Sequence, residues 1–171
     1  MVGLVRTPYI ISIKDCPKKA KIMFLSSLFT GKLSYGIEVY GALTEGQLRQ
    51  LQLVQNRAAR LAIPDSRSTT SEKFKTLNWL DIKAIRTKMD IVTLWKMRLH
   101  RSSPYFERWL RTSRIPVKDL LPVYEPDHGK LLARSFLVRA TLEWNSLPAE
   151  IRATQPSGFK LCLKKYLLDL R

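Results

Sequence analysis

The sequence predicts a mainly α-helical fold, a helical bundle of about five to seven helices with a Pro-rich loop region before the last two. Three observations support this prediction. Apolar residues recur at spacings of three and four along most of the chain. Residues that cap helices precede several of these segments. The 171 residues, 45% hydrophobic and 26% charged, have the composition of a globular protein and not of a disordered tail.

Residues 1–16 are expected to form an extended lead-in, because they contain glycine, proline and a short β-branched run. A helix is predicted from about Pro17 to Gly41, with a kink or break near Gly31 or Gly36. Its apolar positions are Ile22, Leu25, Phe29, Leu33, Ile37 and Tyr40.

The next helix is predicted to start at Thr44, which forms a capping box with Gln47, and to end at Pro64. Its apolar face carries Leu48, Leu51, Val54, Ala58 and Leu61. Its opposite face carries Arg49, Asn56 and Arg60, which serve either simple solvation or contacts to phosphates.

Ser71 is predicted to cap a short helix through Leu77, and Asp81 to cap the clearest helix of the chain. That helix has an apolar stripe of Ile82, Ile85, Met89, Val92, Trp95 and Leu99. Its other face is expected to carry Lys83, Arg86, Asp90 and Arg101. Trp95 is expected in the core, since an aromatic residue within an apolar stripe more often packs than stacks on a base.

Prolines interrupt the stretch that follows Ser102, which predicts a short helix near Tyr105–Arg111 and then a long loop ending near Gly129. Its basic residues, Arg108, Arg111, Arg114 and Lys118, are interpreted as solvated. Two more helices are predicted, at about Ser135–Asn145 and from Ser157 to Leu170. The inner side of the last helix carries Phe159, Cys162, Leu163, Tyr166 and Leu170, while Lys160 and Lys164 face away. We therefore expect a helical subdomain over 17–102 and a C-terminal helical region with a long loop over 103–171.

Charge is the least ordinary property of the chain. Its 30 Lys and Arg residues against 14 Asp and Glu give a formal charge of +16, and they are dispersed along the whole sequence. Such a chain attracts polyanions. Nucleic acid is the expected partner, because neutralised phosphates release counterions. An anionic membrane surface and an inert basic surface are the competing interpretations.

No catalytic pattern is found in the sequence. None of the acidic residues neighbours another, as the paired carboxylates of a polymerase usually do, and there is no Gly-rich phosphate loop. The two cysteines and two histidines, Cys16, Cys162, His100 and His128, lack metal-ligand spacing. We expect no enzyme activity, no metal and no cofactor.

The sequence also indicates where the protein acts. The apolar run from Pro8 to Ile13 is too short for a secretion signal, and no stretch approaches the ~20 apolar residues that span a bilayer. We expect an intracellular protein of the nucleus or cytoplasm, without membrane association.

Several phrases resemble the region after the polymerase core of non-LTR (LINE-type) retrotransposon reverse transcriptases. The runs LSYGIEVYG at Leu33–Gly41 and LQLVQNRAAR at Leu51–Arg60 resemble the thumb segment, although Tyr40 stands where that family often has tryptophan. The run RSFLVRA at Arg134–Ala140 and the phrase WNSLP at Trp144–Pro148 resemble its C-terminal end. The phrases occur in the family's order over about residues 18 to 170.

This resemblance implies a detached C-terminal part: a helical thumb over 17–102 that grips template and primer, and a C-terminal region that helps to hold element RNA or target DNA. The family's endonuclease and polymerase palm are missing, so it implies no chemistry. The Trp144–Pro148 phrase is interpreted as fixing a helix end against the core.

The main functional hypothesis is a non-catalytic nucleic-acid-binding module for RNA, DNA or a hybrid duplex. The residues expected to contact phosphates are Arg49, Arg57, Arg60, Lys83, Arg86, Arg101, Lys160 and Lys164. One alternative is a helical assembly protein, reused from a retroelement, that binds an acidic protein or a ribonucleoprotein. Another is a subunit that completes a polymerase palm supplied by another chain.

Overall fold

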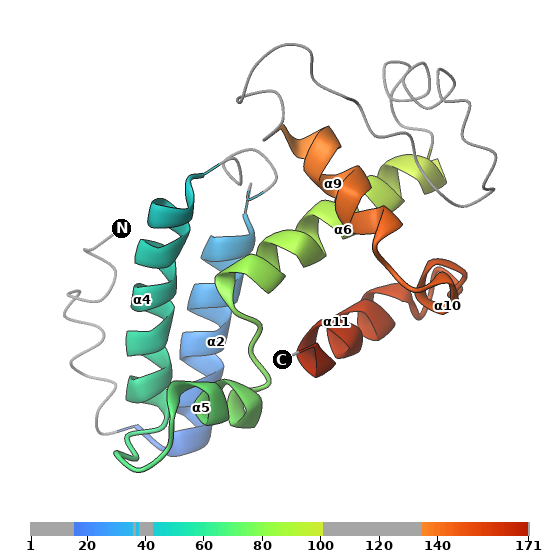
Figure 1. Cartoon of the computed structure of the whole chain (residues 1–171). Helices are drawn as coiled ribbons and strands as arrows, with labels where there is room; N and C mark the ends of the chain where they lie inside the picture. The colour runs from blue at the N-terminus through green and yellow to red at the C-terminus, as the bar shows by residue number, and fades with distance from the viewer. Residues whose placement is uncertain (1–15, 36, 38–42, 101–134, 171) are drawn as a thin grey trace. The chain divides into compact units, whose positions relative to one another are not determined.

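The computed structural model describes residues 16–35, 37, 43–100 and 135–170. These residues form six helices of eight or more residues, one four-residue helix and no strand, which confirms the all-α prediction. The helices are α2 (Lys18–Ser34), α4 (Glu45–Ala62), α5 (Thr70–Leu77), α6 (Ile82–His100), α9 (Phe136–Asn145), α10 (Ala149–Arg152) and α11 (Phe159–Asp169) (Figure 1). The lead-in over 1–15 and the helix and loop predicted within 101–134 lie outside the described residues.

The described residues belong to two compact units. The first unit contains α2, α4, α5 and the start of α6 up to Ile85. The second contains Ile37, α6 from Arg86 onward, α9, α10 and α11. The sequence suggested a division near residue 102, whereas the change of unit lies inside α6. Helical periodicity runs unbroken through α6, so the pattern could not reveal this.

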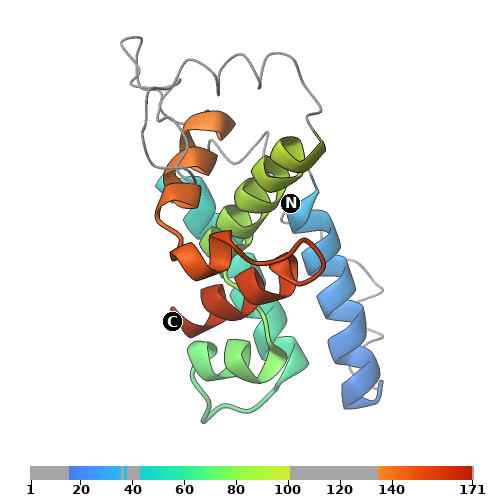
Figure 2. The same cartoon turned by 90° about the vertical axis from the view of Figure 1, so that its right-hand side faces the viewer.

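The core of the first unit forms where α2 and α5 both pack against α4 (Figure 2). Three alanines of α4 are buried there, and their small side chains let the neighbouring helices approach closely. Phe74 and Trp79 meet edge to face, with ring centroids 6.0 Å apart. The buried members of this core are Leu25, Leu48, Ala58, Ala59, Ala62, Phe74, Leu77, Trp79 and Ile82.

Helix boundaries follow the capping chemistry. The predicted capping box of Thr44 and Gln47 is confirmed, and the Asp81 carboxylate accepts a 2.8 Å hydrogen bond from the backbone N–H of Ala84. The prediction that Ser71 caps α5 is wrong. Thr69 is the cap, because a glutamate three residues later, Glu72, completes a capping box that Ser71 could not form.

Two glutamines of α4 hold the segment that leads into α6. Gln55 is buried and donates a 2.7 Å hydrogen bond to the carbonyl of Leu80, and Gln52 accepts a 2.9 Å bond from the N–H of Ile82. Gln52 also donates to Asn56, at 2.8 Å. The LQLVQN part of the resemblance therefore has a structural role: it satisfies backbone groups that would otherwise be buried without partners.

Stacked aromatic rings form the core of the second unit. Trp95 of α6 stacks on Phe159 of α11 with centroids 5.0 Å apart, and Trp144 of α9 lies 5.8 Å from the same ring. Trp95 is half-buried and packs on a ring, as expected for a packing residue, and the burial of Trp144 agrees with the structural interpretation of the Trp144–Pro148 phrase. Within that phrase, the carbonyl of Asn145 accepts a 3.1 Å hydrogen bond from Arg152 of α10.

The inner face of α11 differs from the prediction at Leu167, Cys162 and Leu170. Phe159, Leu163 and Leu167 are buried, one helical turn apart. Cys162 and Leu170, expected on the inner side, are exposed. The helix also starts one residue later than predicted, with Gly158 and not Ser157 at its N-cap. Leu170 is exposed because it is the C-cap, beyond the last turn of α11, and Cys162 lies about 100° around the axis from Leu163, away from the buried stripe.

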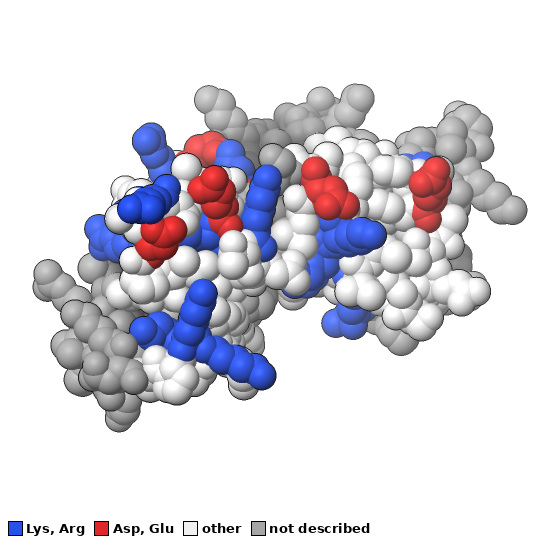
Figure 3. All heavy atoms as spheres, turned by 90° about the horizontal axis from the view of Figure 1, so that it is seen from below, with Lys and Arg blue, Asp and Glu red and all other residues white. Residues whose placement is uncertain are grey.

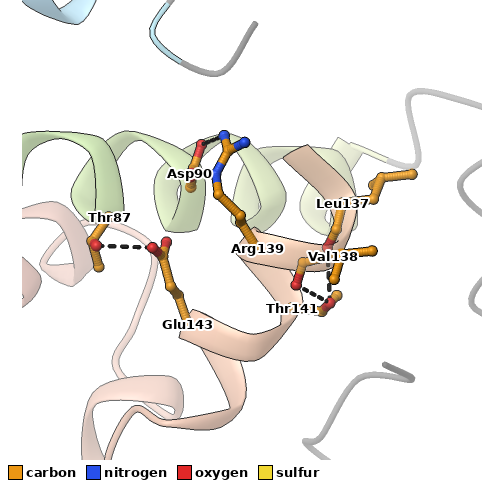
Figure 4. Close-up of polar contacts among 7 residues, drawn as sticks. All are labelled: Thr87, Asp90, Leu137, Val138, Arg139, Thr141 and Glu143. Carbon is orange, nitrogen blue, oxygen red and sulfur yellow. Dashed lines mark hydrogen bonds and ion pairs between the residues drawn. The ribbon is translucent and has the colours of Figure 1, made fainter. Parts of the chain in front are cut away.

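Asp90 is the main correction in α6. The sequence placed it on the solvent face, but its side chain is fully buried and paired with Arg139 of α9 (Figure 4). The guanidinium of Arg139 donates two hydrogen bonds to the carboxylate, from Nε to Oδ2 at 3.0 Å and from Nη2 to Oδ1 at 3.1 Å. The bidentate geometry offsets the cost of removing both charges from water.

Replacing Gln55 by leucine is expected to destabilise the first unit by about 1 to 3 kcal/mol, because the carbonyl of Leu80 loses its buried donor. Urea unfolding followed by circular dichroism measures the loss. Gln50→Leu is the matched control, since Gln50 is an exposed position of the same helix. Equal effects of the two substitutions would contradict the role assigned to Gln55.

Asp90→Leu is expected to cost about 3 to 5 kcal/mol of unfolding free energy, because it leaves the largely buried Arg139 charge without its partner. The double variant Asp90→Leu with Arg139→Met is expected to be more stable than Asp90→Leu alone. Glu45→Gln, which breaks the exposed ion pair with Lys83, provides the control and should change stability by less than about 1 kcal/mol. A double variant as unstable as the single one would show that the pair is not the main interaction.

Candidate nucleic-acid interface

The outer face of α4 carries three exposed arginines, Arg49, Arg57 and Arg60. None of them forms an ion pair with a described residue. Arg49 and Arg60 lie about 16 Å apart along the axis, at ~1.5 Å per residue. Asn56, which was predicted on this face with Arg49 and Arg60, instead accepts a hydrogen bond from Gln52 and is half-buried. Three guanidinium groups along one helix can contact several phosphates of one backbone.

Lys83, in the first turn of α6, also belongs to the first unit. Its ammonium lies 2.6 Å from the Glu45 carboxylate at the start of α4, and both side chains are well exposed. An exposed ion pair of this kind contributes little to stability. Lys83 can therefore exchange Glu45 for a phosphate at small cost.

Arg86 does not project outward, as the sequence analysis expected. Its side chain is half-buried in the second unit, its Nε is shielded from solvent, and its charge acts on Glu143 of α9. The sequence could not reveal this, because the partner lies far along the chain on another helix. Arg101 lies outside the described residues.

The carboxyl group of Glu143 has a strongly raised pKa. Burial and, after it, the negative charge of Asp90 raise the pKa of Glu143 to about 7, against the opposing effects of a 2.9 Å hydrogen bond from Thr87 and the charges of Arg86 and Arg139 (Figure 4). Because these groups lie between the packed helices α6 and α9, the cluster couples the second unit's core to pH near neutrality.

Lys160 and Lys164 lie one turn apart on α11, the first exposed and the second half-buried. Sequence reasoning missed a third lysine beside them, Lys88 of α6, which is also half-buried. Burial lowers the pKa of Lys88, and the positive charges of Lys164 and Lys160 lower it further. The sequence pattern did not indicate Lys88, because it belongs to a helix remote in sequence from α11 and falls outside the basic face predicted for its own helix.

Four other basic residues serve the fold and not the surface. The buried Lys73 donates to the backbone carbonyls of Ile63 and Asp65, and Arg139 pairs with Asp90. Arg98 lies over the Trp144 ring at 5.0 Å, and Arg152 donates to a backbone carbonyl. Net charge therefore overstates the basic surface.

The described basic side chains visible in Figure 3 are spread out, with acidic ones among them. On the face seen in Figure 3, Lys and Arg side chains stand singly or in small groups beside Asp and Glu side chains. Such a surface matches contacts to a charged backbone better than a single deep anion pocket.

Within residues 16–35, 37, 43–100 and 135–170, no three His, Cys, Asp or Glu side chains are grouped as metal ligands. Among the same residues, no helix is both long and apolar enough to cross a membrane.

The second unit is expected to lose stability as pH rises from 5 to 8. Glu143 has a folded pKa of about 7 against 4.5 in the unfolded chain, so the folded state holds the extra proton between these values. The stabilisation is complete below about pH 4.5 and disappears as pH passes 7, a change of roughly 3 kcal/mol. Urea unfolding at pH 5 and at pH 8 measures the change in the free energy of unfolding.

The variant Glu143→Gln mimics the protonated side chain and should remove most of this pH dependence. Glu150→Gln, on the exposed surface of α10, should leave it intact. The same pH dependence in wild type and Glu143→Gln would exclude Glu143 as its source.

Comparison of the chain with protein-family models, with curated proteins and with solved structures gave no match. The candidate interface therefore stands on its geometry and charge.

Proposed function

We propose that this protein is a non-catalytic nucleic-acid-binding module that holds the sugar–phosphate backbone of RNA, DNA or a hybrid duplex. The observation that carries the proposal is the exposed arginine face of α4, where Arg49, Arg57 and Arg60 have no carboxylate partner among the described residues. Guanidinium groups without partners on a rigid helix are suited to phosphates, because their planar donors match phosphate oxygens.

The overall charge of +16 supports the same function, because it attracts a polyanion over long range. The resemblance to the thumb and C-terminal region of non-LTR retrotransposon reverse transcriptases also supports it, and adds template–primer duplex or element RNA as the expected ligand. Contacts of this kind read the backbone and not the bases, so binding should depend steeply on salt and weakly on sequence.

The wild-type chain is expected to bind duplex and single-stranded nucleic acid at ~50 mM salt, with log affinity falling linearly against log salt. Replacing Arg49, Arg57 and Arg60 by glutamine should reduce the salt slope by about 3, close to one per lost phosphate contact. Fluorescence anisotropy with labelled oligonucleotides measures both quantities.

A control variant changes three exposed basic residues of the first unit outside α4: Lys32→Gln, Arg67→Gln and Lys75→Gln. It removes the same charge and should reduce the slope by less. Absence of any binding at ~50 mM salt would refute the proposal. If an acidic polypeptide such as polyglutamate bound tightly while nucleic acid did not, the chain would instead be an assembly protein for an acidic partner.

A further inference from the structure

Three lysines of the second unit do not belong to the arginine face of α4 on which the proposed function rests. Lys160 and Lys164 come from α11 and Lys88 from α6, two helices held together by the stacked rings of Trp95 and Phe159. Lys88 lies seven residues before Trp95, two turns along the same face of α6, and Lys160 directly follows Phe159, so the ring contact brings the two lysine-bearing segments toward each other. The positive charges of Lys164 and Lys160 act on Lys88 across this contact.

Such a cluster costs free energy unless an anion offsets it. Lys88 is half-buried and its ammonium is partly removed from water, which increases this cost. None of the three lysines forms an ion pair with a described carboxylate. In the same unit the largely buried Arg139 has its own carboxylate, so these three lysines differ from the basic residues that serve the fold.

We propose that Lys88, Lys160 and Lys164 form a second phosphate-binding site, which holds neighbouring phosphates of a nucleic-acid backbone. Lys160 and Lys164 are separated by one turn, about 6 Å along the axis of α11, and so present two ammonium groups side by side. Lysine is a compact point charge that binds phosphate without the fixed geometry of a guanidinium. Lys88 completes the site from the neighbouring helix.

A membrane surface is less well suited to this site. Helices that bind at a lipid boundary need a continuous apolar face that is free to insert. On α11 the apolar residues Phe159, Leu163 and Leu167 are buried in the unit's core. The exposed leucines of this helix, Leu161 and Leu170, lie about 180° apart around its axis and cannot form such a face.

The proposal rests on nucleic-acid binding by the whole chain, and the test separates the two. The double variant Lys88→Gln with Lys164→Gln removes one lysine from each helix of the site. Its matched control, Lys96→Gln with Lys165→Gln, removes one exposed lysine from each of the same two helices. Circular dichroism and thermal melting establish that both variants fold.

The site variant is expected to reduce the salt slope for duplex binding by about 2, while the control reduces it clearly less. Mass spectrometry after amine acylation should show Lys160 and Lys164 protected by added duplex, and Lys96 unprotected. Equal slopes in the two variants, with wild-type chain still bound to duplex, would overturn the second site and leave the proposed function standing.

Absence of duplex binding by the wild-type chain would overturn both proposals together. Anionic vesicles of phosphatidylserine are the comparison ligand. If the site variant lost vesicle binding but kept its affinity for duplex, the lysines would be a lipid-binding surface and the proposal would be wrong.

Discussion

Repulsion among positive charges is the constraint on which the rest of this structure depends. A chain with a formal charge of +16 lowers its electrostatic free energy by expanding, which opposes folding. A compact fold must therefore pair its charges, bury them with partners or spread them apart. The fold uses all three solutions. Lys73 donates to backbone carbonyls, Arg139 pairs with Asp90, and the arginines of α4 lie apart on an outer face. The cluster at Lys88 is the exception, and that is why it points to a ligand.

The sequence could predict the helices because their start signals are local. The capping box at Thr44 and the cap at Asp81 depend on residues three positions apart, and both are found as predicted. It could not predict which polar residues are buried, because burial depends on partners far along the chain. Asp90 lies on the polar side of its helix by spacing alone, yet Arg139 of α9 makes that side an interior one.

The candidate site shows the same limit. Arg49 and Arg60 of α4 are exposed as the sequence predicted, since one helix with a clear apolar face determines its own outer face, and Arg57 is exposed beside them. Arg86 was misplaced, because its side chain is half-buried in the second unit, where its charge acts on Glu143 of α9. Lys88 was missed for the converse reason: its significance comes from Lys160 and Lys164 of α11 and not from its own helix.

The phrases that carry the family resemblance have clear structural roles. Gln52 and Gln55 hold the segment before α6, and Trp144 packs against Phe159 in the second unit. Such residues persist in a fold even where function changes, because removing them leaves buried groups without partners. The resemblance therefore bears more directly on the fold than on what the fold binds. Function has to be decided at exposed residues that the fold does not need, and Arg49, Arg57 and Arg60 meet that condition because they make no ion pair with the described residues.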